Sequence, residues 1–83
     1  MEKSTISAID QFVIDKVREM RIELGYSQKE LSSLLDMAIS FVGNVESPNK
    51  RDKYNLTHLN KIAEVFACSP KDFLPEKFLK NKK

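Results

Sequence analysis

The residue types that most often perform catalysis or hold metal ions are scarce in this chain. His58 is the only histidine and Cys68 the only cysteine among 83 residues, and neither has a second ligand at a spacing that suits a metal ion. No glycine-rich phosphate loop occurs, and the acidic residues fit helix caps, ion pairs or solvated surfaces. We therefore expect no catalytic residue, no metal, no cofactor and no enzymatic activity.

Cationic side chains that could bind phosphate cluster in one short segment, Asn49–Lys53. Lys50, Arg51 and Lys53 lie there with only Asp52 to offset them. Such a cluster can neutralise the backbone phosphates of a nucleic acid. The alternative is a solvated loop without a ligand, and charge alone favours this second interpretation.

The segment from Ser27 to Glu46, which precedes the basic loop, predicts two short helices joined by a tight turn. Ser27 and Glu30 have the spacing of a capping box, so the first helix begins there. Asp36 tolerates a turn or left-handed conformation, so the helix should end at that residue.

A second helix is predicted from Ile39 to Glu46. Val42 and Val45 are three residues apart and should face the core together. The residues that this turns outward are Ser40, Gly43 and Asn44.

The second helix has weak intrinsic stability. Ala38 precedes it and cannot accept a capping hydrogen bond, which costs roughly 0.5–2 kcal/mol relative to a good cap. Gly43 in its middle costs about 1 kcal/mol more. We therefore expect packing to hold this helix.

Two stretches of the chain resemble the lambda-repressor-like (Cro or XRE) helix-turn-helix family, and together they cover roughly Val13 to Leu74. The first is V-R-E-M-R-I-E-L-G-Y-S-Q-K-E-L-S-S-L-L-D-M-A-I-S-F-V-G-N-V-E, which looks like the helix-turn-helix itself. The second is L-T-H-L-N-K-I-A-E-V-F-A-C-S-P-K-D-F-L, which resembles the fourth and fifth helices. The resemblance implies an all-α, compact five-helix domain whose helices 2 and 3 form the motif. It also implies sequence-specific binding of double-stranded DNA in transcription control, with helix 3 in the major groove.

The resemblance assigns base contacts to the start of helix 3 and to one turn further on. These residues are Ala38, Ile39, Ser40 and Asn44. Asparagine can bind adenine in a bidentate manner, serine can bond to several bases, and an apolar side chain can meet a thymine methyl. We therefore expect half-sites that contain A·T pairs and are read partly by shape. For Ile39 and Phe41 the alternative is packing at a helix edge or subunit contact, and we expect it for Phe41.

Phosphate contacts follow from the same resemblance. Gln28 matches the family's glutamine that anchors to a phosphate, helped by free amides and the helix dipole, and the alternative is a glutamine on the helix surface without a ligand. Ser27 and Gln28 should fix the register on DNA without reading sequence. Gly43 either lets the backbone approach sugar and phosphate or is merely tolerated. Further contacts are assigned to Lys50, Arg51 and Lys53. Where the family usually has a polar residue and glycine, this chain has Ser47-Pro48, so the path of the loop departs from the family's.

The resemblance also implies a structural ion pair between Arg21 and Glu46. If that pair is buried, removing one partner would strand a charge and cost about 3–5 kcal/mol. An exposed pair would contribute under about 1 kcal/mol.

The remaining elements follow from apolar spacing and caps. An amphipathic helix is predicted from Ile6 to Leu24 and is ended by Gly25. Asn55 should cap a helix from Leu56 to Ala67, Ser69 a fifth helix from Pro70, and a further turn is expected over Glu76–Leu79. We expect a mobile terminus over residues 1–5, the domain over 6–75 and a basic tail over 76–83.

Composition fits one small globular domain. Hydrophobic residues make up 41% and charged residues 31% of the chain. The tail has four lysines against one glutamate, a net charge of +3, so the total of +2 leaves −1 for residues 1–75. The single cysteine and the lack of a signal-peptide pattern predict a cytoplasmic protein, and no apolar run approaches the roughly 20 residues that span a membrane.

The family resemblance, together with the basic loop, predicts a DNA-binding transcriptional regulator that acts as a repressor. One domain of this size contacts few phosphates and bases, so we expect a homodimer on paired half-sites. Phe78 and Leu79 could form the dimer contact or pack on their own domain. The alternative function is a protein-interaction or antitoxin-like module whose partner comes from a neighbouring gene.

Overall fold

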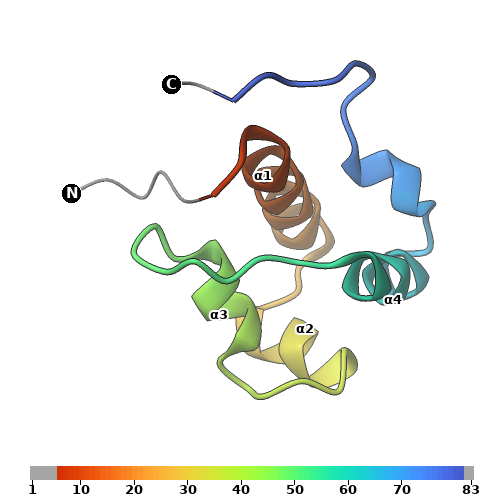
Figure 1. The fold of residues 1–83 in the computed structure, drawn as a ribbon. Helices are drawn as coiled ribbons and strands as arrows, with labels where there is room; N and C mark the ends of the chain where they lie inside the picture. Colours follow the sequence, from red (N-terminus) through yellow and green to blue (C-terminus); the bar gives the residue numbers. More distant parts are fainter. Residues whose placement is uncertain (1–5, 82–83) are drawn as a thin grey trace.

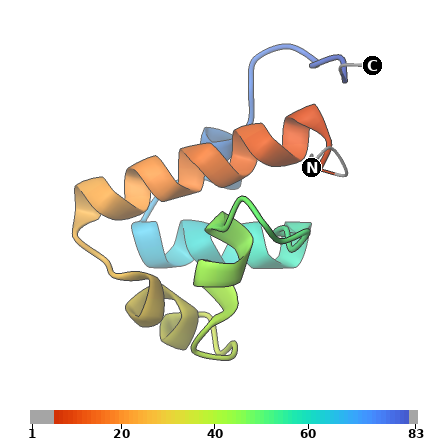
Figure 2. The ribbon, with the colours of Figure 1, turned by 90° about the vertical axis from the view of Figure 1, so that its left-hand side faces the viewer.

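A computed structural model describes residues 6–81, and its regular structure there is entirely helical. The elements are α1 (Ala8–Leu24), α2 (Gln28–Leu34), α3 (Phe41–Glu46), α4 (Leu56–Phe66) and the 3-10 helix η1 (Pro70–Phe73). Both views place α1 uppermost among the α-helices, with α2 and α3 below it (Figures 1 and 2). None of the helices within residues 6–81 is long and apolar enough to cross a bilayer. The predicted mobile terminus, residues 1–5, and the last two tail residues lie outside the described part.

One hydrophobic core joins all five elements. Its largest fully buried side chains include Phe73 from η1, Leu31 from α2 and Ile62 from α4. Val17 of α1 and Val42 of α3 are also completely buried. Several apolar residues of the helices and their flanks stay exposed instead. They are Ile9, Leu24, Leu34 and Leu56.

The short-range signals for helix ends are confirmed. Ser27 and Glu30 form a complete capping box at the start of α2. Gly25 ends α1 in the left-handed conformation with φ 86°, and Asp36 follows α2 with φ 60°. Ser69 caps η1 through its side chain. These signals depend only on residues within one helical turn of each other, so the sequence predicts them well.

The prediction of five α-helices is wrong in its last element. Described residues contain four α-helices, and the fifth is the 3-10 helix η1, with i to i+3 bonds from Asp72 N to Ser69 O (2.9 Å) and Leu74 N to Lys71 O (3.1 Å). Only five residues separate Ser69 from Pro75, and proline disfavours helical backbone in the residue before it. A short 3-10 turn fits that space and an α-helix does not.

The tail is also not helical, contrary to the expected turn over Glu76–Leu79. It runs as irregular chain along the side of α1 away from α2 and α3 (Figures 1 and 2). The side-chain oxygen of Asn81 accepts a hydrogen bond of 2.7 Å from the backbone N–H of Ala8. This bond gives a partner to one of the free amides at the start of α1. Phe78 is 81% exposed, so it does not pack on its own domain.

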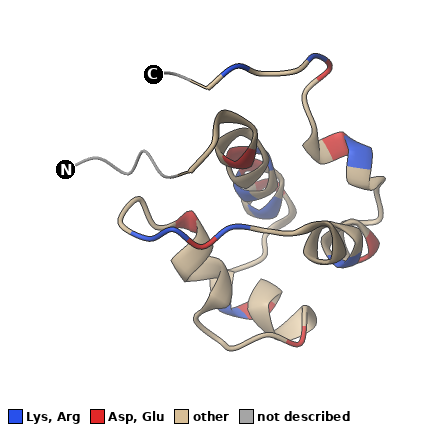
Figure 3. Cartoon of the chain, viewed as in Figure 1, with Lys and Arg blue, Asp and Glu red and all other residues tan. Residues whose placement is uncertain are grey.

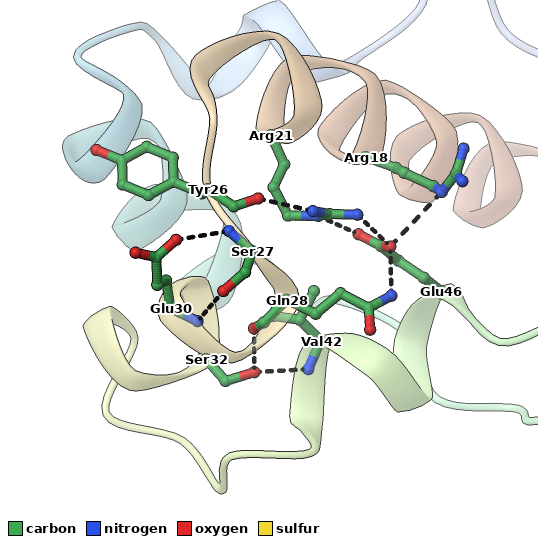
Figure 4. A network of polar contacts seen from close by, with 9 residues as sticks. All are labelled: Arg18, Arg21, Tyr26, Ser27, Gln28, Glu30, Ser32, Val42 and Glu46. Atoms are coloured by element: carbon green, nitrogen blue, oxygen red, sulfur yellow. Dashed lines mark hydrogen bonds and ion pairs between the residues drawn. The ribbon is translucent and has the colours of Figure 1, made fainter.

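A buried carboxylate joins the first three helices (Figure 4). Arg21 of α1 binds Glu46 of α3 through two parallel bonds, Nε to Oε2 and Nη2 to Oε1, both 2.8 Å. The third guanidinium bond goes from Nη1 to the carbonyl of Tyr26, at 2.7 Å. The side chains are 9% and 3% exposed. A bidentate, buried pair of this kind is among the stronger polar contacts in proteins.

The start of α4 is capped by a pair that includes the only histidine. Asn55 Oδ1 accepts from the backbone N–H of His58 at 2.8 Å, and His58 Nδ1 accepts from the backbone N–H of Asn55 at 3.0 Å. The imidazole also packs on Phe41 with ring centroids 4.8 Å apart. His58 is therefore half-buried. Burial lowers the pKa of His58 below its usual value of 6.5.

We predict that Glu46→Ala destabilises the domain by about 3–5 kcal/mol, because it leaves the Arg21 guanidinium buried without its carboxylate. Urea unfolding followed by circular dichroism measures the change. The matched control is Lys61→Met, which removes the exposed Lys61–Glu64 pair on α4 and should cost under about 1 kcal/mol. Equal effects of the two variants would contradict a structural role for the buried pair.

We predict that stability falls as pH drops below about 6.5, and that His58→Gln reduces this fall. The folded-state pKa of His58 is depressed, so the unfolded chain takes up a proton at a higher pH than the folded chain does. The free energy of unfolding therefore falls as pH drops from the unfolded pKa to the folded pKa, and the fall stops below the folded pKa. Protonation also turns Nδ1 from acceptor to donor and so breaks the cap. The measurement is the urea midpoint at pH 7 and pH 5 for both chains. An unchanged pH dependence in the variant would refute the assignment.

Candidate nucleic-acid interface

The residues predicted to read bases lie together at the surface around the start of α3. Ala38, Ile39 and Ser40 are exposed and form the turn before the helix, closed by a bond of 2.9 Å from Phe41 N to Ala38 O. Asn44 lies one turn into α3 and is half-buried. We call these four residues the reading surface. The helix begins at Phe41, two residues later than predicted.

The reading surface is held from behind by packing. Val42 is 0% and Val45 3% exposed, so the opposite side of α3 is part of the core. Phe41 is half-buried and packs against Tyr54 and His58. The packed side of α3 is therefore as predicted, while of the residues predicted to face outward Ser40 is exposed and Gly43 and Asn44 are half-buried.

A serine on α2 replaces the missing cap of α3. The Ser40 side chain makes no capping bond to any described residue. Instead, Ser32 Oγ accepts a bond of 2.9 Å from the backbone N–H of Val42 and donates one of 2.9 Å to the carbonyl of Gln28 (Figure 4). Ser32 is fully buried. Sequence reasoning missed it, because its partner is ten residues away and helix patterns show only nearer pairs.

Gln28, the predicted phosphate anchor, bonds within the protein. Its Nε2 donates to Glu46 Oε1 at 2.9 Å. Its Oε1 would lie 3.2 Å from a Cβ atom added at Gly43, so a side chain there would crowd the glutamine. Gly43 thus gives Gln28 room to lie against α3. A side chain at position 43 would require Gln28 to shift by a few tenths of an ångström.

Arg18 is a cation close to Gln28 and was not among the site residues predicted from the sequence. Its Nε lies 3.6 Å from Glu46 Oε1, the same oxygen that accepts from Gln28 (Figure 4). Its side chain is 57% exposed, so the guanidinium stays accessible to an anion. The spacing of three residues from Arg21 could have indicated it, because residues three apart share one side of a helix.

The other predicted phosphate contacts are divided between two places. Ser27 lies at the start of α2, where its hydroxyl oxygen accepts from Glu30 N at 2.9 Å. Lys50 and Arg51 are exposed on the loop after α3, where Figure 3 shows basic residues on either side of one acid. Lys53 is exposed too, but its Nζ lies 3.4 Å from Asp10 Oδ2 on α1. The charge of Lys53 is therefore partly neutralised by Asp10, which leaves Lys50 and Arg51 as the stronger candidates for phosphate contacts.

Among residues 6–81 no group of three or more His, Cys, Asp or Glu side chains could hold a metal ion. The chemistry available at the reading surface is hydrogen bonding and apolar contact, and the exposed cations Arg18, Lys50 and Arg51 lie outside it.

Comparison with known proteins identifies the fold. A family model described as helix-turn-helix matches residues 17–73. A hypothetical transcription factor from Neisseria superposes with a TM-score of 0.69 at 24% identity, covering 81% of this chain and 75% of that one. No curated protein sequence matches the chain.

Two further solved structures are similar. The restriction-modification controller protein C.AhdI from Aeromonas hydrophila has 28% identity and a TM-score of 0.64, with 76% of this chain and 92% of that chain covered. The N-terminal DNA-binding domain of SinR from Bacillus subtilis has 25% identity and a TM-score of 0.64, with 82% and 97% covered. With the family model spanning most of the chain and this geometry at α2 and α3, the chain belongs to the helix-turn-helix family of Cro and XRE type.

Proposed function

We propose that this chain is a sequence-specific, double-stranded-DNA-binding regulator of transcription that inserts α3 in the major groove and acts as a repressor. The observation that carries the proposal is the accessible Ser40 and Asn44 on a helix whose other side is fixed by Val42 and Val45. A rigid helix with polar groups on its free side is what direct readout requires. The DNA-binding domain of SinR has a similar structure.

Base readout in this proposal rests on few groups. Asn44 makes a bidentate contact to adenine, Ser40 bonds to a base edge, and Ile39 or Ala38 meets a thymine methyl. Ile39 is 57% exposed, so it is free for such a contact. With only two polar reading residues, shape readout contributes to the preference for A·T-containing half-sites.

Backbone phosphates are bound on both sides of α3. Gln28 and Arg18 lie together at one side, next to the start of α2, and Ser27 adds its hydroxyl there. Gln28 exchanges its bond with Glu46 for one with phosphate, and Arg18 contributes charge. On the other side Lys50 and Arg51 bind phosphate, with Lys53 as a weaker contributor because of Asp10. These phosphate contacts fix the register of the domain on the duplex but do not distinguish one base sequence from another.

The active species in this proposal is a cytoplasmic homodimer on half-sites about 34–36 Å apart, one turn of B-DNA. A single domain offers too few contacts for high affinity. A second copy doubles the number of phosphates and bases contacted.

A second candidate function, a protein-interaction or antitoxin-like module, has one specific observation in its favour. Leu34, Met37 and Ile39 are all exposed around the turn between α2 and α3. An apolar patch at this position suits a protein partner, such as the product of a neighbouring gene, as well as it suits thymine methyls.

We predict that Asn44→Ala removes the preference at one base pair and reduces specific affinity by about 1–3 kcal/mol. Binding to random duplex should change little, because Asn44 reads a base and does not neutralise phosphate. Fluorescence anisotropy with duplexes selected from a random pool, and with single-base variants of them, measures both. Equal losses on selected and random duplex would contradict base readout by Asn44, and an absence of any selected duplex would favour the protein-interaction module.

We predict that Lys50→Ala and Arg51→Ala each flatten the salt dependence of DNA binding, by about 0.9 in the log–log slope for each phosphate that the variant no longer neutralises. Lys61→Ala on the exposed side of α4 is the control and should leave the slope unchanged. The measurement is affinity for one duplex across a series of salt concentrations. An unaltered slope in both loop variants would show that the loop is a solvated segment.

A further inference from the structure

None of the helices that the structure describes covers the outer side of α1, opposite the buried Val13 and Val17. Figure 1 shows α1 above α2 and α3, with the irregular tail beyond it. An open groove of about 710 Å³ runs along this side, and within the described residues its lining side chains all come from α1. Phe12 is half-buried near one end of the groove, and Ile22 is 53% exposed near the other. We call this side of α1, from Phe12 to Glu23, the outer face.

Three carboxylates accompany these two apolar residues on the outer face. Asp15, Glu19 and Glu23 follow one another at intervals of four residues, so they form a row along one side of the helix. Lys16 Nζ lies 3.7 Å from Glu19 Oε1. Asp15 and Glu23 form no ion pair with any residue that the structure describes. The row therefore keeps negative charge without a cation beside it.

We propose that the outer face docks a helix of a different protein, one that carries arginine or lysine between two apolar side chains. An amphipathic helix is the usual occupant of a groove that presents apolar anchors at helical spacing. Phe12 and Ile22 are ten residues apart, about 15 Å along the helix axis, so the partner's two apolar residues need a similar separation. Cations of the partner meet the unpaired carboxylates of Asp15 and Glu23, which excludes acidic partners.

The charge of the outer face is unfavourable for other occupants. A nucleic acid or an anionic lipid surface is repelled by the carboxylate row. Two copies meeting outer face to outer face across a two-fold axis would oppose their own acids. The chain's tail has suitable chemistry in Lys77, Phe78 and Lys80, but none of its described residues lines the groove, and Phe78 is 81% exposed. A separate protein with a basic helix is the occupant that these charges fit.

The outer face leaves α3 free for a duplex, a point that rests on the proposed function. α2 and α3 lie on the other side of α1 (Figures 1 and 2). Arg18 lines the edge of the groove, and its Nε lies 3.6 Å from Glu46 Oε1, which also accepts from Gln28. The outer face and the proposed phosphate contacts therefore meet at Arg18, and a partner helix and a duplex can be bound together.

The first test uses the full chain without DNA and a synthetic probe. The probe is a fluorescent, alanine-based helix of about 20 residues, long enough to form in water. It carries leucine, arginine, arginine and leucine at the spacing of Phe12, Asp15, Glu19 and Ile22. Fluorescence anisotropy should show saturable binding, and the same peptide with glutamate in place of arginine should bind about tenfold more weakly. Equal binding of the two peptides, or no binding of either, would overturn the proposal.

Matched variants of the chain locate the bound probe. Glu19→Lys and Glu64→Lys each reverse an exposed acid that pairs with a lysine three residues earlier, at 3.7 and 3.5 Å. Glu19→Lys should weaken probe binding about tenfold, because it places a like charge in the groove, whereas Glu64→Lys on α4 should leave it unchanged. Thermal melting of each variant verifies folding. Equal effects of the two reversals would show general charge attraction and refute the site.

The natural occupant is tested with a photoreactive amino acid in place of Ile22 of the full chain, in the cells that produce it. Mass spectrometry of the crosslinked peptide should find a segment of another protein with arginine or lysine between apolar residues. The same photoreactive amino acid in place of Glu64 is the control and should not capture that segment. Crosslinks to Lys77–Lys80 of this chain, or the absence of any protein adduct, would overturn the proposal.

Duplex binding is measured separately, so that this inference and the proposed function can fail independently. Ile22→Ser should bind the probe about tenfold more weakly and bind a selected duplex as the parent chain does, because the outer face lies on the other side of α1 from α3. A parent chain that binds the probe but no duplex would refute the proposed function and leave the outer face intact as a site. Equal losses of probe and duplex binding in Ile22→Ser would refute a separate docking site.

Discussion

The arrangement of the motif depends on one buried carboxylate, that of Glu46. Its oxygens accept from Arg21 on α1 and Gln28 on α2, while Arg18 on α1 lies 3.6 Å away. A carboxylate that is 3% exposed is stable as an ion only when such donors surround it. The need to satisfy this group constrains the angle between α1 and α3, and the same carboxylate holds Gln28, the proposed phosphate anchor.

The helix that carries the reading surface has little stability of its own. It has six residues, a glycine in the middle and no capping bond from Ser40 to the described part of the chain. A helix this short would not persist alone in water. Ser32 gives its first turn a hydrogen-bond acceptor, Val42 and Val45 bury one side, and Glu46 fastens its end. Contacts from other helices thus hold α3, and with it the residues proposed to read bases, in place.

The opposite end of α3 is connected to α4 by an aromatic cluster. Phe41 packs on both Tyr54 and His58, with ring centroids 5.8 and 4.8 Å apart. Tyr54 belongs to the segment that also carries Lys50 and Arg51, and burial raises the pKa of its hydroxyl, with Glu46 adding to the effect. Phe41 therefore links α3 both to the start of α4 and to the end of the basic loop.

The sequence by itself determined the helix-turn-helix family and the helix ends at Ser27, Gly25 and Asp36, because each end depends on groups within one helical turn. It also separated the buried Val42 and Val45 from the accessible Ser40 and Asn44, because a helix repeats every 3.6 residues. Only the tertiary structure decided that Ser32 caps α3, that Gln28 and Arg18 share Glu46, and that Leu56 is exposed. These features join residues that are 10 to 28 positions apart or depend on how completely one helix covers another. Such distances are set by packing of the whole chain, which local patterns do not contain.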